Sequence, residues 1–320
     1  MPMEAASEGA AAGVAARGVR RSFGRVEALR GVDLTAPYGE VTALVGPNGS
    51  GKTTLLLVLA TLLQADGGGV EVAGFDPVTD PGSVRARVGW MPDVFGTYEQ
   101  LSVREYLTFF GQAYRLPAAE IRTRVGELLA LVDLESHAGE PVRVLSRGQK
   151  QRLGVARALV HRPEVLLLDE PAAGLDPRAR VQLRRLLRTL AADGTAVLVS
   201  SHILSELEEI ADRVVVMDRG VTVGTHRLGA GDTSTAAARR RWRIRALDEE
   251  PLLAALDQRG LAYGDPAPTG VEVELGSDDE AAELLAELVA AGVRVVSCAP
   301  AVGGVEAAYI EATESAEERE

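Results

Sequence analysis

The sequence predicts an α/β protein with a mostly parallel sheet, an antiparallel edge layer and a helical insertion, followed by a small C-terminal α/β domain. Between residues 14 and 225, short apolar runs typical of buried strands alternate with segments of helical periodicity. Residues 226–238 are mostly small or polar, as in a linker. The charge also changes along the chain, because residues 246–320 carry a net charge of −15 and the preceding residues carry +3. Two bodies with different roles are therefore expected.

The first domain is expected to begin with the antiparallel edge layer, formed by strands at residues 18–30 and 32–37. Residues 41–45 form a continuous apolar run that ends at Gly46, which predicts a buried strand. Helical periodicity follows directly and predicts a helix at residues 53–64.

The helical insertion comes next, and two more buried strands follow it. Pro117 divides the insertion into two helices, because proline cannot continue a helix. Apolar runs separated by a helical segment indicate neighbouring parallel strands. The predicted elements are helices at residues 101–114, 118–131 and 182–191 and buried strands at residues 165–168 and 196–200.

The C-terminal domain, residues 239–313, has its own alternation of strands and helices. Strands are expected at residues 242–247, 271–275 and 293–297, helices at residues 251–259 and 278–291, and a helical or extended segment at residues 305–312. Residues 314–320 are interpreted as an acidic tail. At the other end, the Ala- and Gly-rich residues 1–13 are interpreted as a disordered leader.

The composition excludes several classes of protein. Hydrophobic residues make up 46% and charged residues 25%, which excludes a chain that is mainly disordered. No apolar run approaches the ~18 residues that cross a bilayer, and the N-terminus lacks the apolar core of a signal peptide, so a cytoplasmic location is expected. Cys298 is the single cysteine, which excludes an intrachain disulfide. The net charge of −12 argues against a nucleic-acid partner.

A phosphate-binding loop is predicted where residues 46–53 match the pattern G-x-x-x-x-G-K-[ST] between a strand and a helix. Its residues are Gly46, Pro47, Asn48, Gly49, Ser50, Gly51, Lys52 and Thr53, with Thr54 directly after. Glycines let successive N–H groups surround a polyphosphate at a helix N-terminus. Lys52 supplies a compact charge to the β- and γ-phosphates, and Lys150 is the only other lysine. The Thr53 hydroxyl is an oxygen ligand suited to Mg²⁺.

Two acidic residues, Asp169 and Glu170, follow the apolar run 165–168. Asp169 lies at the carboxyl end of the predicted strand, from which it can reach the Mg²⁺ through water. Glu170 then lies where an attacking water must be held and deprotonated. The alternative is a pair of solvated acids at a strand end.

Residues 145–152, Leu-Ser-Arg-Gly-Gln-Lys-Gln-Arg, closely resemble the signature L-S-G-G-Q of ATP-binding cassette (ABC) proteins. The resemblance covers residues 14–225, where the motifs occur in the order and at the spacing of the family. It implies a P-loop NTPase cassette in which the signature opens a helix. It also implies that Ser146, Gly148 and Gln149 bind the γ-phosphate of an ATP held by a partner cassette. Arg147 departs from the family pattern, which most often has glycine there.

Other segments resemble the remaining elements of the cassette. Asp176 belongs to a stretch similar to the D-loop, which crosses the dimer interface. His202 resembles the switch histidine that contacts the γ-phosphate, and the resemblance makes it catalytic together with Glu170 and Lys52. Phe23 resembles the aromatic residue that stacks on adenine; the alternative is a buried aromatic in an edge strand.

The stretch before Asp93 resembles the segment that precedes the Q-loop glutamine of the family. Asp93 takes the place of that glutamine and would serve as an oxygen ligand for Mg²⁺ or water, with Gln100 as a weaker substitute. Residues 95–106 follow, where family members contact their membrane subunit. The other histidines, His137, His161 and His226, are interpreted as structural or surface residues.

The resemblance implies an ATPase that works with Mg²⁺ as a homodimer holding two ATP molecules, because Lys52 and Ser146 must meet across two chains. Since no membrane span is predicted, the channel would belong to a separate integral membrane permease, with this chain peripheral on the inner face of the cell membrane. A cassette with such an appendage is similar to the ATPase subunits of bacterial exporters of drugs, antibiotics, lipids or polysaccharides, among them the daunorubicin-resistance ATPases.

Two alternatives remain open at this point. One is a soluble ABC ATPase that acts on ribosomes or DNA without a membrane partner; such proteins usually have tandem cassettes or long insertions, and this chain has one cassette. The other is a non-catalytic, nucleotide-gated binding module, against which Glu170 and His202 argue.

Overall fold

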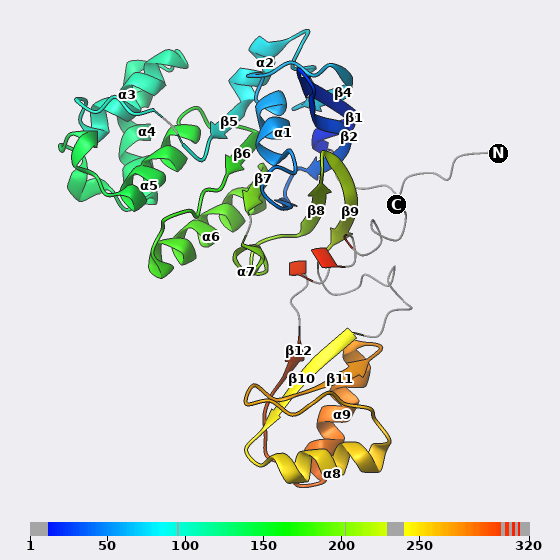
Figure 1. Cartoon of the computed structure of the whole chain (residues 1–320). Helices are drawn as coiled ribbons and strands as arrows, with labels where there is room; N and C mark the ends of the chain where they lie inside the picture. The colour runs from blue at the N-terminus through cyan, green and yellow to red at the C-terminus, as the bar shows by residue number, and fades with distance from the viewer. Residues whose placement is uncertain are drawn as a thin grey trace. The chain divides into compact units, whose positions relative to one another are not determined.

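The computed structural model describes residues 12–94, 96–201, 203–228, 240–301, 305–306, 309–310 and 313 (Figure 1). Most of the predicted leader and linker, and all of the predicted acidic tail, lie outside these residues. The chain divides into two compact units, one of residues up to 228 together with those from 308, and one within residues 229–307. Among the described residues, none of the helices combines the length and the apolar character that a bilayer-crossing segment needs.

A six-stranded sheet forms the centre of the first unit, with the order β5-β6-β7-β3-β8-β9. Its strands are β5 (Val88–Met91), β6 (Val165–Asp169), β7 (Ala196–Ser201), β3 (Val41–Val45), β8 (Arg213–Asp218) and β9 (Val221–Arg227). All neighbours are parallel except β9, which pairs antiparallel with β8. Every residue of β3, β6 and β7 is buried, as is typical of central parallel strands. The prediction of a mostly parallel sheet is confirmed.

The antiparallel edge layer is a separate three-stranded sheet with the order β2-β1-β4, formed by β1 (Ala12–Phe23), β2 (Val26–Pro37) and β4 (Gly67–Val72). The predicted single strand over residues 18–30 is wrong, because a two-residue turn with Gly24 at φ 61° divides it into a hairpin. The apolar residues of this sheet share one core with helix α1 and the central strands. Trp90 packs against the edge of that core.

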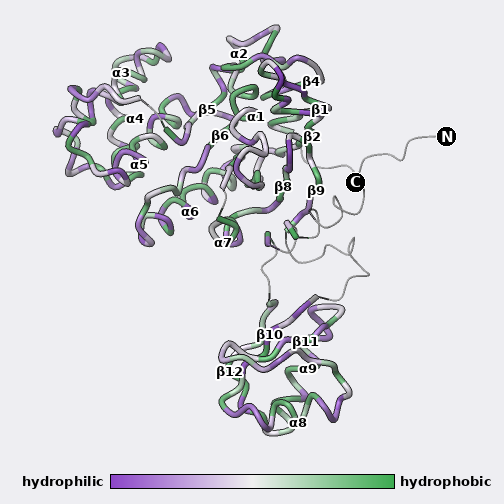
Figure 2. Tube along the Cα trace, in the orientation of Figure 1, coloured by the Kyte–Doolittle hydropathy of each residue, from purple (hydrophilic) through white to green (hydrophobic). Residues whose placement is uncertain are grey.

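The helices of the first unit are α1 (Lys52–Leu59), α2 (Pro81–Arg87), α3 (Val103–Ala113), α4 (Ala118–Leu131), α5 (Arg147–Ala158), α6 (Pro177–Ala192) and α7 (Leu204–Leu207), with the 3-10 turns η1 (Glu135–His137) and η2 (Val142–Val144) (Figure 1). Of these, α3 and α4 are the two helices of the predicted insertion. Hydrophobic and hydrophilic residues alternate along α6, as its one buried face requires (Figure 2).

Two predicted helix boundaries are wrong for identifiable reasons. The helix expected at residues 53–64 ends at Leu59, because Thr61 adopts the left-handed conformation with φ 63°. The helix expected at residues 182–191 begins one turn earlier, at Pro177, where Asp176 caps it. An Asp followed by Pro is a helix-start signal, so this boundary was readable from the sequence.

The second unit contains β10 (Arg240–Ala246), α8 (Glu249–Arg259), β11 (Val271–Leu275), α9 (Asp278–Ala290) and β12 (Val295–Pro300). Its antiparallel sheet has the order β11-β10-β12. Trp242 and Ile244 of β10 lie in a core that also includes apolar residues of α8 and α9. Because side chains alternate along a strand, Arg241 and Arg243 lie on the opposite face, where Arg243 pairs with Glu272 at 2.5 Å. Cys298 is partly buried.

His161 is a structural residue, as expected from the sequence. Its ring stacks on Tyr114, with 3.7 Å between the ring centroids and 9° between the planes. Since a carbonyl only accepts, His161 Nε2 donates to Val88 O at 3.1 Å, and Nδ1 is buried without a hydrogen-bond partner among the described residues. Burial lowers the pKa of His161 to about 4.

This buried imidazole is expected to make the free energy of unfolding depend on pH. Its pKa is below the ordinary value of 6.5, so the unfolded chain binds the proton first. Its stabilising contribution is complete above pH ~6.5 and falls by roughly 3 kcal/mol as the pH drops toward ~4. The His161→Phe variant keeps a ring for Tyr114 and should lose this part of the pH dependence. Urea unfolding of both proteins at pH 5 and pH 7.5 measures how much the free energy of unfolding changes between the two pH values. An equal change in the parent protein and in His161→Phe would contradict the role given to this imidazole.

Candidate functional site

The predicted phosphate loop connects β3 to α1, and its glycines have conformations that require glycine. Gly49 and Gly51 have φ values of 84° and 102°. A Cβ on Gly51 would lie 2.6 Å from Ala28 O, and one on Gly46 would lie 2.2 Å from Met217 O. Replacement by any larger residue would therefore displace neighbouring backbone.

The loop projects its middle residues outward and anchors its last turn. Pro47, Asn48 and Gly49 are exposed, whereas Ser50 is buried. Ser50 N donates to Pro47 O at 3.2 Å, and Ser50 O accepts from Gly220 N at 3.0 Å. Thr54, in the first turn of α1, is half-buried. Such a loop at a helix N-terminus fits an anionic phosphate group.

Lys52 is the first residue of α1, and its side chain turns back into the loop. Lys52 Nζ donates to Gly46 O at 2.6 Å and to Pro47 O at 3.0 Å. The residue is only 8% exposed. Burial lowers the pKa of Lys52, and the nearby carboxylates Glu170 and Asp169 partly offset this effect. The loop and the acidic pair thus lie close enough to interact.

Thr53 and Asp169 bring two oxygen ligands together beside the loop. Thr53 Oγ1 donates to Asp169 Oδ2 at 2.8 Å, and Ser200 Oγ donates to Asp169 Oδ1 at 2.6 Å. Asp169 is 2% exposed, at the end of β6. A hydroxyl and a carboxylate are hard oxygen donors, so this pair fits Mg²⁺.

Glu170 is positioned by its backbone. Its φ of 50° is unusual for a residue with a side chain. Glu170 N donates to Ser200 Oγ at 3.1 Å, and Glu170 O accepts from Gln151 Nε2 at 3.2 Å. Gln151, in α5, is buried. Predicted His202 lies outside the described residues.

The sequence reasoning missed Ser200 and Gln151. Ser200 is completely buried and joins Asp169 to the backbone of Glu170. The signal was present, because a hydroxyl at the carboxyl end of an otherwise apolar strand lies at the same sheet edge as Asp169. No comparable signal exists for Gln151, whose contact depends on the packing of α5.

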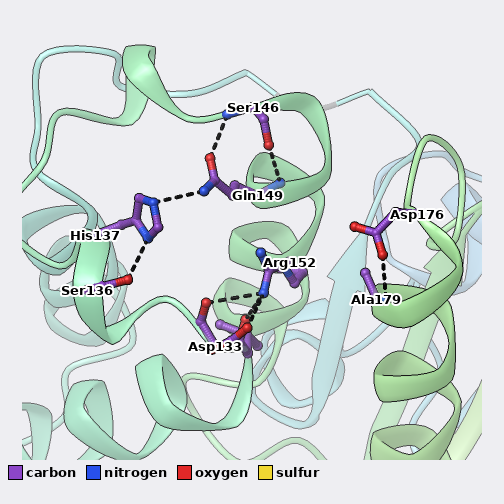
Figure 3. A network of polar contacts seen from close by, with 9 residues as sticks. Asp133, Ser136, His137, Ser146, Gln149, Arg152, Asp176 and Ala179 are labelled. Carbon is purple, nitrogen blue, oxygen red and sulfur yellow. Dashed lines mark hydrogen bonds and ion pairs between the residues drawn. The ribbon is translucent and has the colours of Figure 1, made fainter.

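The segment that resembles the ABC signature begins helix α5, as predicted, and Ser146 is the N-cap of this helix (Figure 3). Ser146 Oγ accepts from Gln149 N at 3.2 Å, and Gln149 Oε1 accepts from Ser146 N at 2.8 Å, which together form a capping box. Gln149 Nε2 lies 2.9 Å from Nε2 of His137. None of these partners of Ser146 and Gln149 belongs to the phosphate loop.

Two residues of the signature, Arg147 and Gly148, contact the stretch that resembles the D-loop. A Cβ on Gly174 would lie 2.8 Å from Arg147 Nε, so the arginine side chain runs against Gly174. Gly148 lies close to the same segment, since a Cβ there would be 3.6 Å from Gly174 O. Asp176 Oδ1 accepts from Ala179 N at 2.9 Å as the cap of α6 (Figure 3), and this hydrogen bond lowers the pKa of Asp176.

Two predicted site residues are exposed and have no contact with the phosphate loop in the described part of the chain. Phe23 is 48% exposed, which rules out the buried-aromatic alternative, and the Arg21 guanidinium lies 4.8 Å from its ring centroid. Asp93, after β5, is also exposed. Gln100 accepts from Arg143 Nη1 at 2.6 Å.

Known proteins are similar to this chain in sequence and in fold. The family model described as ABC transporter matches residues 29–173. The daunorubicin resistance ATP-binding protein DrrA3 of Streptomyces coeruleorubidus is 42% identical over 203 residues, 63% of this chain and 64% of the relative. The linearmycin resistance ATP-binding protein LnrL of Bacillus subtilis (strain 168) is 32% identical over 225 residues, 68% and 72% of the two chains.

A solved structure extends the comparison to a nucleotide-bound state. The dimeric structure of a post-hydrolysis state of the ATP-binding cassette MJ0796 bound to ADP and Pi matches with a TM-score of 0.63 and 27% identity. The match covers 68% of this chain and 100% of that chain. By contrast, the matched region spans only 64% of the length of DrrA3.

Proposed function

Because the chain belongs to the ABC transporter family of ATP-binding proteins, we propose that it binds and hydrolyses ATP with Mg²⁺. One observation carries this proposal: a continuous series of hydrogen bonds runs from Thr53 through Asp169 and Ser200 to Glu170, beside the buried Lys52. Phosphoryl transfer needs positioned groups and charge stabilisation more than covalent chemistry, and this series supplies both.

Each residue has a distinct role in the proposed reaction. The loop N–H groups and Lys52 hold the phosphates, and Phe23 offers its exposed ring to the adenine. Thr53 and Asp169 would hold the Mg²⁺, which neutralises charge on the phosphate oxygens. Glu170 orients and deprotonates the attacking water. As the family resemblance implies, His202 would contact the γ-phosphate, and Asp93 would be an oxygen ligand for Mg²⁺ or water.

We propose further that two copies form the complete site. The side chains of Ser146 and Arg147 are exposed at the start of α5, and the described contacts of Ser146 lie within α5 itself. An exposed helix N-terminus suits the γ-phosphate of an ATP bound by a second copy. The dimer of MJ0796 with ADP and Pi supports this arrangement.

The proposed partner is an integral membrane permease that this ATPase drives from the inner face of the membrane. An aromatic cluster of Tyr98, Tyr106, Phe109 and Phe110 fits such a contact, with Tyr98 53% and Phe109 40% exposed. The resistance functions in the names of DrrA3 and LnrL support export of a drug or antibiotic.

The proposal is tested with the purified full chain and MgATP. Phosphate release measures hydrolysis, and light scattering coupled to size exclusion measures dimer formation. Affinity purification from membranes then identifies a permease. If the chain neither binds MgATP nor forms a dimer, the ATPase assignment is overturned. Hydrolysis without any membrane partner would favour the ribosome or DNA alternative.

Ser200→Ala is expected to lower kcat by about ten-fold, because Asp169 loses a hydrogen-bond donor and Glu170 N loses its acceptor. The KM for ATP should change less. Ser201→Ala is the matched control, since Ser201 is equally buried but its Oγ accepts from Ile203 N instead. Phosphate-release kinetics give the kcat of the two variants. An equal loss of kcat in both would indicate a general packing effect rather than the loss of the hydrogen bonds of Ser200.

A further inference from the structure

His137 is the last residue of turn η1, which precedes the signature helix α5 in the chain. Its side chain contacts Gln149 in the first turn of α5 (Figure 3). Its two ring nitrogens have different partners. Nε2 lies 2.9 Å from Gln149 Nε2, and Nδ1 lies 3.0 Å from Ser136 Oγ. No sequence pattern connects this histidine with the signature, because twelve positions separate it from Gln149.

The capping box fixes the orientation of the Gln149 amide. Gln149 Oε1 accepts from Ser146 N at 2.8 Å, and a backbone N–H can only donate. Gln149 Nε2 is therefore the NH₂ group, and it donates to His137 Nε2. That nitrogen must be unprotonated, so the ring proton is on Nδ1, which donates to the Ser136 hydroxyl. The network requires a neutral imidazole in one tautomer.

A doubly protonated imidazole would break this network. Its Nε2–H would oppose the NH₂ group of Gln149, and two donors repel each other. Turning the amide around would satisfy His137 but would remove the acceptor for Ser146 N and open the capping box. The charge on His137 and the cap of α5 are thus linked.

Charged residues occur on η1 and on the segments next to it. They are Asp133 after α4, Glu135 within η1, Glu140 after it, Arg104 in α3, and Lys150 and Arg152 in α5. Arg152 Nη1 forms an ion pair with Asp133 Oδ2 at 3.1 Å. In the described part of the chain, the ring nitrogens of His137 have only Gln149 and Ser136 as hydrogen-bond partners.

We propose that neutral His137 is a positioning residue, which holds the N-terminus of α5 in the geometry that engages ATP. The inference rests on the proposed function, since the ligand of Ser146 is the γ-phosphate bound by a second copy. The same helix contacts the proposed hydrolytic residue, because Gln151 donates to Glu170 O.

The first test measures the tautomer and needs no ATP. The full chain has four histidines, so ¹⁵N-labelled imidazole signals are assigned by comparison with His137→Phe. The expected result at pH 8 is a His137 with the proton on Nδ1. In Gln149→Glu, the side chain no longer donates to Nε2, so the Nδ1–H tautomer should lose its preference over the Nε2–H tautomer. A proton on Nε2 of the parent protein at pH 8 would overturn the proposal.

The second test separates positioning from packing. His137→Phe is expected to raise the KM for ATP about five-fold at pH 8, the effect of one typical hydrogen bond, with kcat within two-fold. His137→Gln offers a carbonyl acceptor and should restore the KM. An unchanged KM in His137→Phe would overturn the proposal, whereas absence of hydrolysis in the parent protein would overturn the proposed function and leave the tautomer measurement decisive.

Discussion

Glu170→Gln is expected to reduce the rate of ATP hydrolysis by about 10²- to 10⁴-fold and to trap a dimer that holds ATP. Glutamine has nearly the same shape as glutamate but cannot take the proton of the attacking water. The backbone of residue 170 should keep its position, because Ser200 Oγ and Gln151 Nε2 bind its N and O atoms rather than its carboxylate. Binding of MgATP should therefore survive while turnover stops.

The measurement combines phosphate release with light scattering in the presence of MgATP. Glu164→Gln is the matched control, since Glu164 precedes β6 at the opposite end from Glu170 and pairs with Arg87 on the surface at 3.2 Å. That variant should hydrolyse ATP at the parental rate and remain monomeric after turnover. Parental hydrolysis by Glu170→Gln would show that another group positions the water.

Lys52→Ala is expected to weaken MgATP binding by about 100-fold, because an ammonium that contacts phosphate contributes a charge-assisted hydrogen bond from a largely buried position. Lys52 is 8% exposed, and burial lowers its pKa, so the charged side chain is costly to keep in the folded protein without a phosphate. The variant should therefore fold as well as the parent protein. Lys52→Arg should not rescue binding, since a planar guanidinium fits the slot poorly.

Calorimetric titration with MgATP measures this effect, and thermal unfolding verifies the fold. Arg122→Ala is a convenient control, because it also removes one positive charge and Arg122 lies exposed on α4, outside the phosphate loop and the signature. Comparable weakening in both variants would mean that loss of net charge, rather than the contact in the loop, explains the result.

The buried parallel strands could be predicted from the sequence, because burial on both faces leaves a continuous apolar run. Val41–Val45 was predicted with its observed bounds, and the run at residues 165–168 was one residue short of β6. The hairpin of β1 and β2 could not be predicted correctly. Its first residues are Ala- and Gly-rich, and they become a strand through pairing with β2 and β4 rather than through local preference.

The candidate site also contains residues that the sequence predicts and contacts that it does not predict. Lys52, Thr53 and Asp169 belong to motifs whose spacing predicts that they meet, and their side chains do lie together. The contacts of Ser200, Gln151 and His137 join segments that are distant in the chain, so they depend on how the helices pack. Sequence patterns report local geometry and say little about such contacts.

The separate cores of the two units have a practical consequence for spectroscopy. The chain contains two tryptophans, of which Trp90 packs against the core of the first unit and Trp242 lies in the core of the second. Each unit therefore contains one tryptophan. Changing either tryptophan to phenylalanine leaves tryptophan emission from a single unit, so nucleotide effects on that unit can be followed without a tryptophan signal from the other.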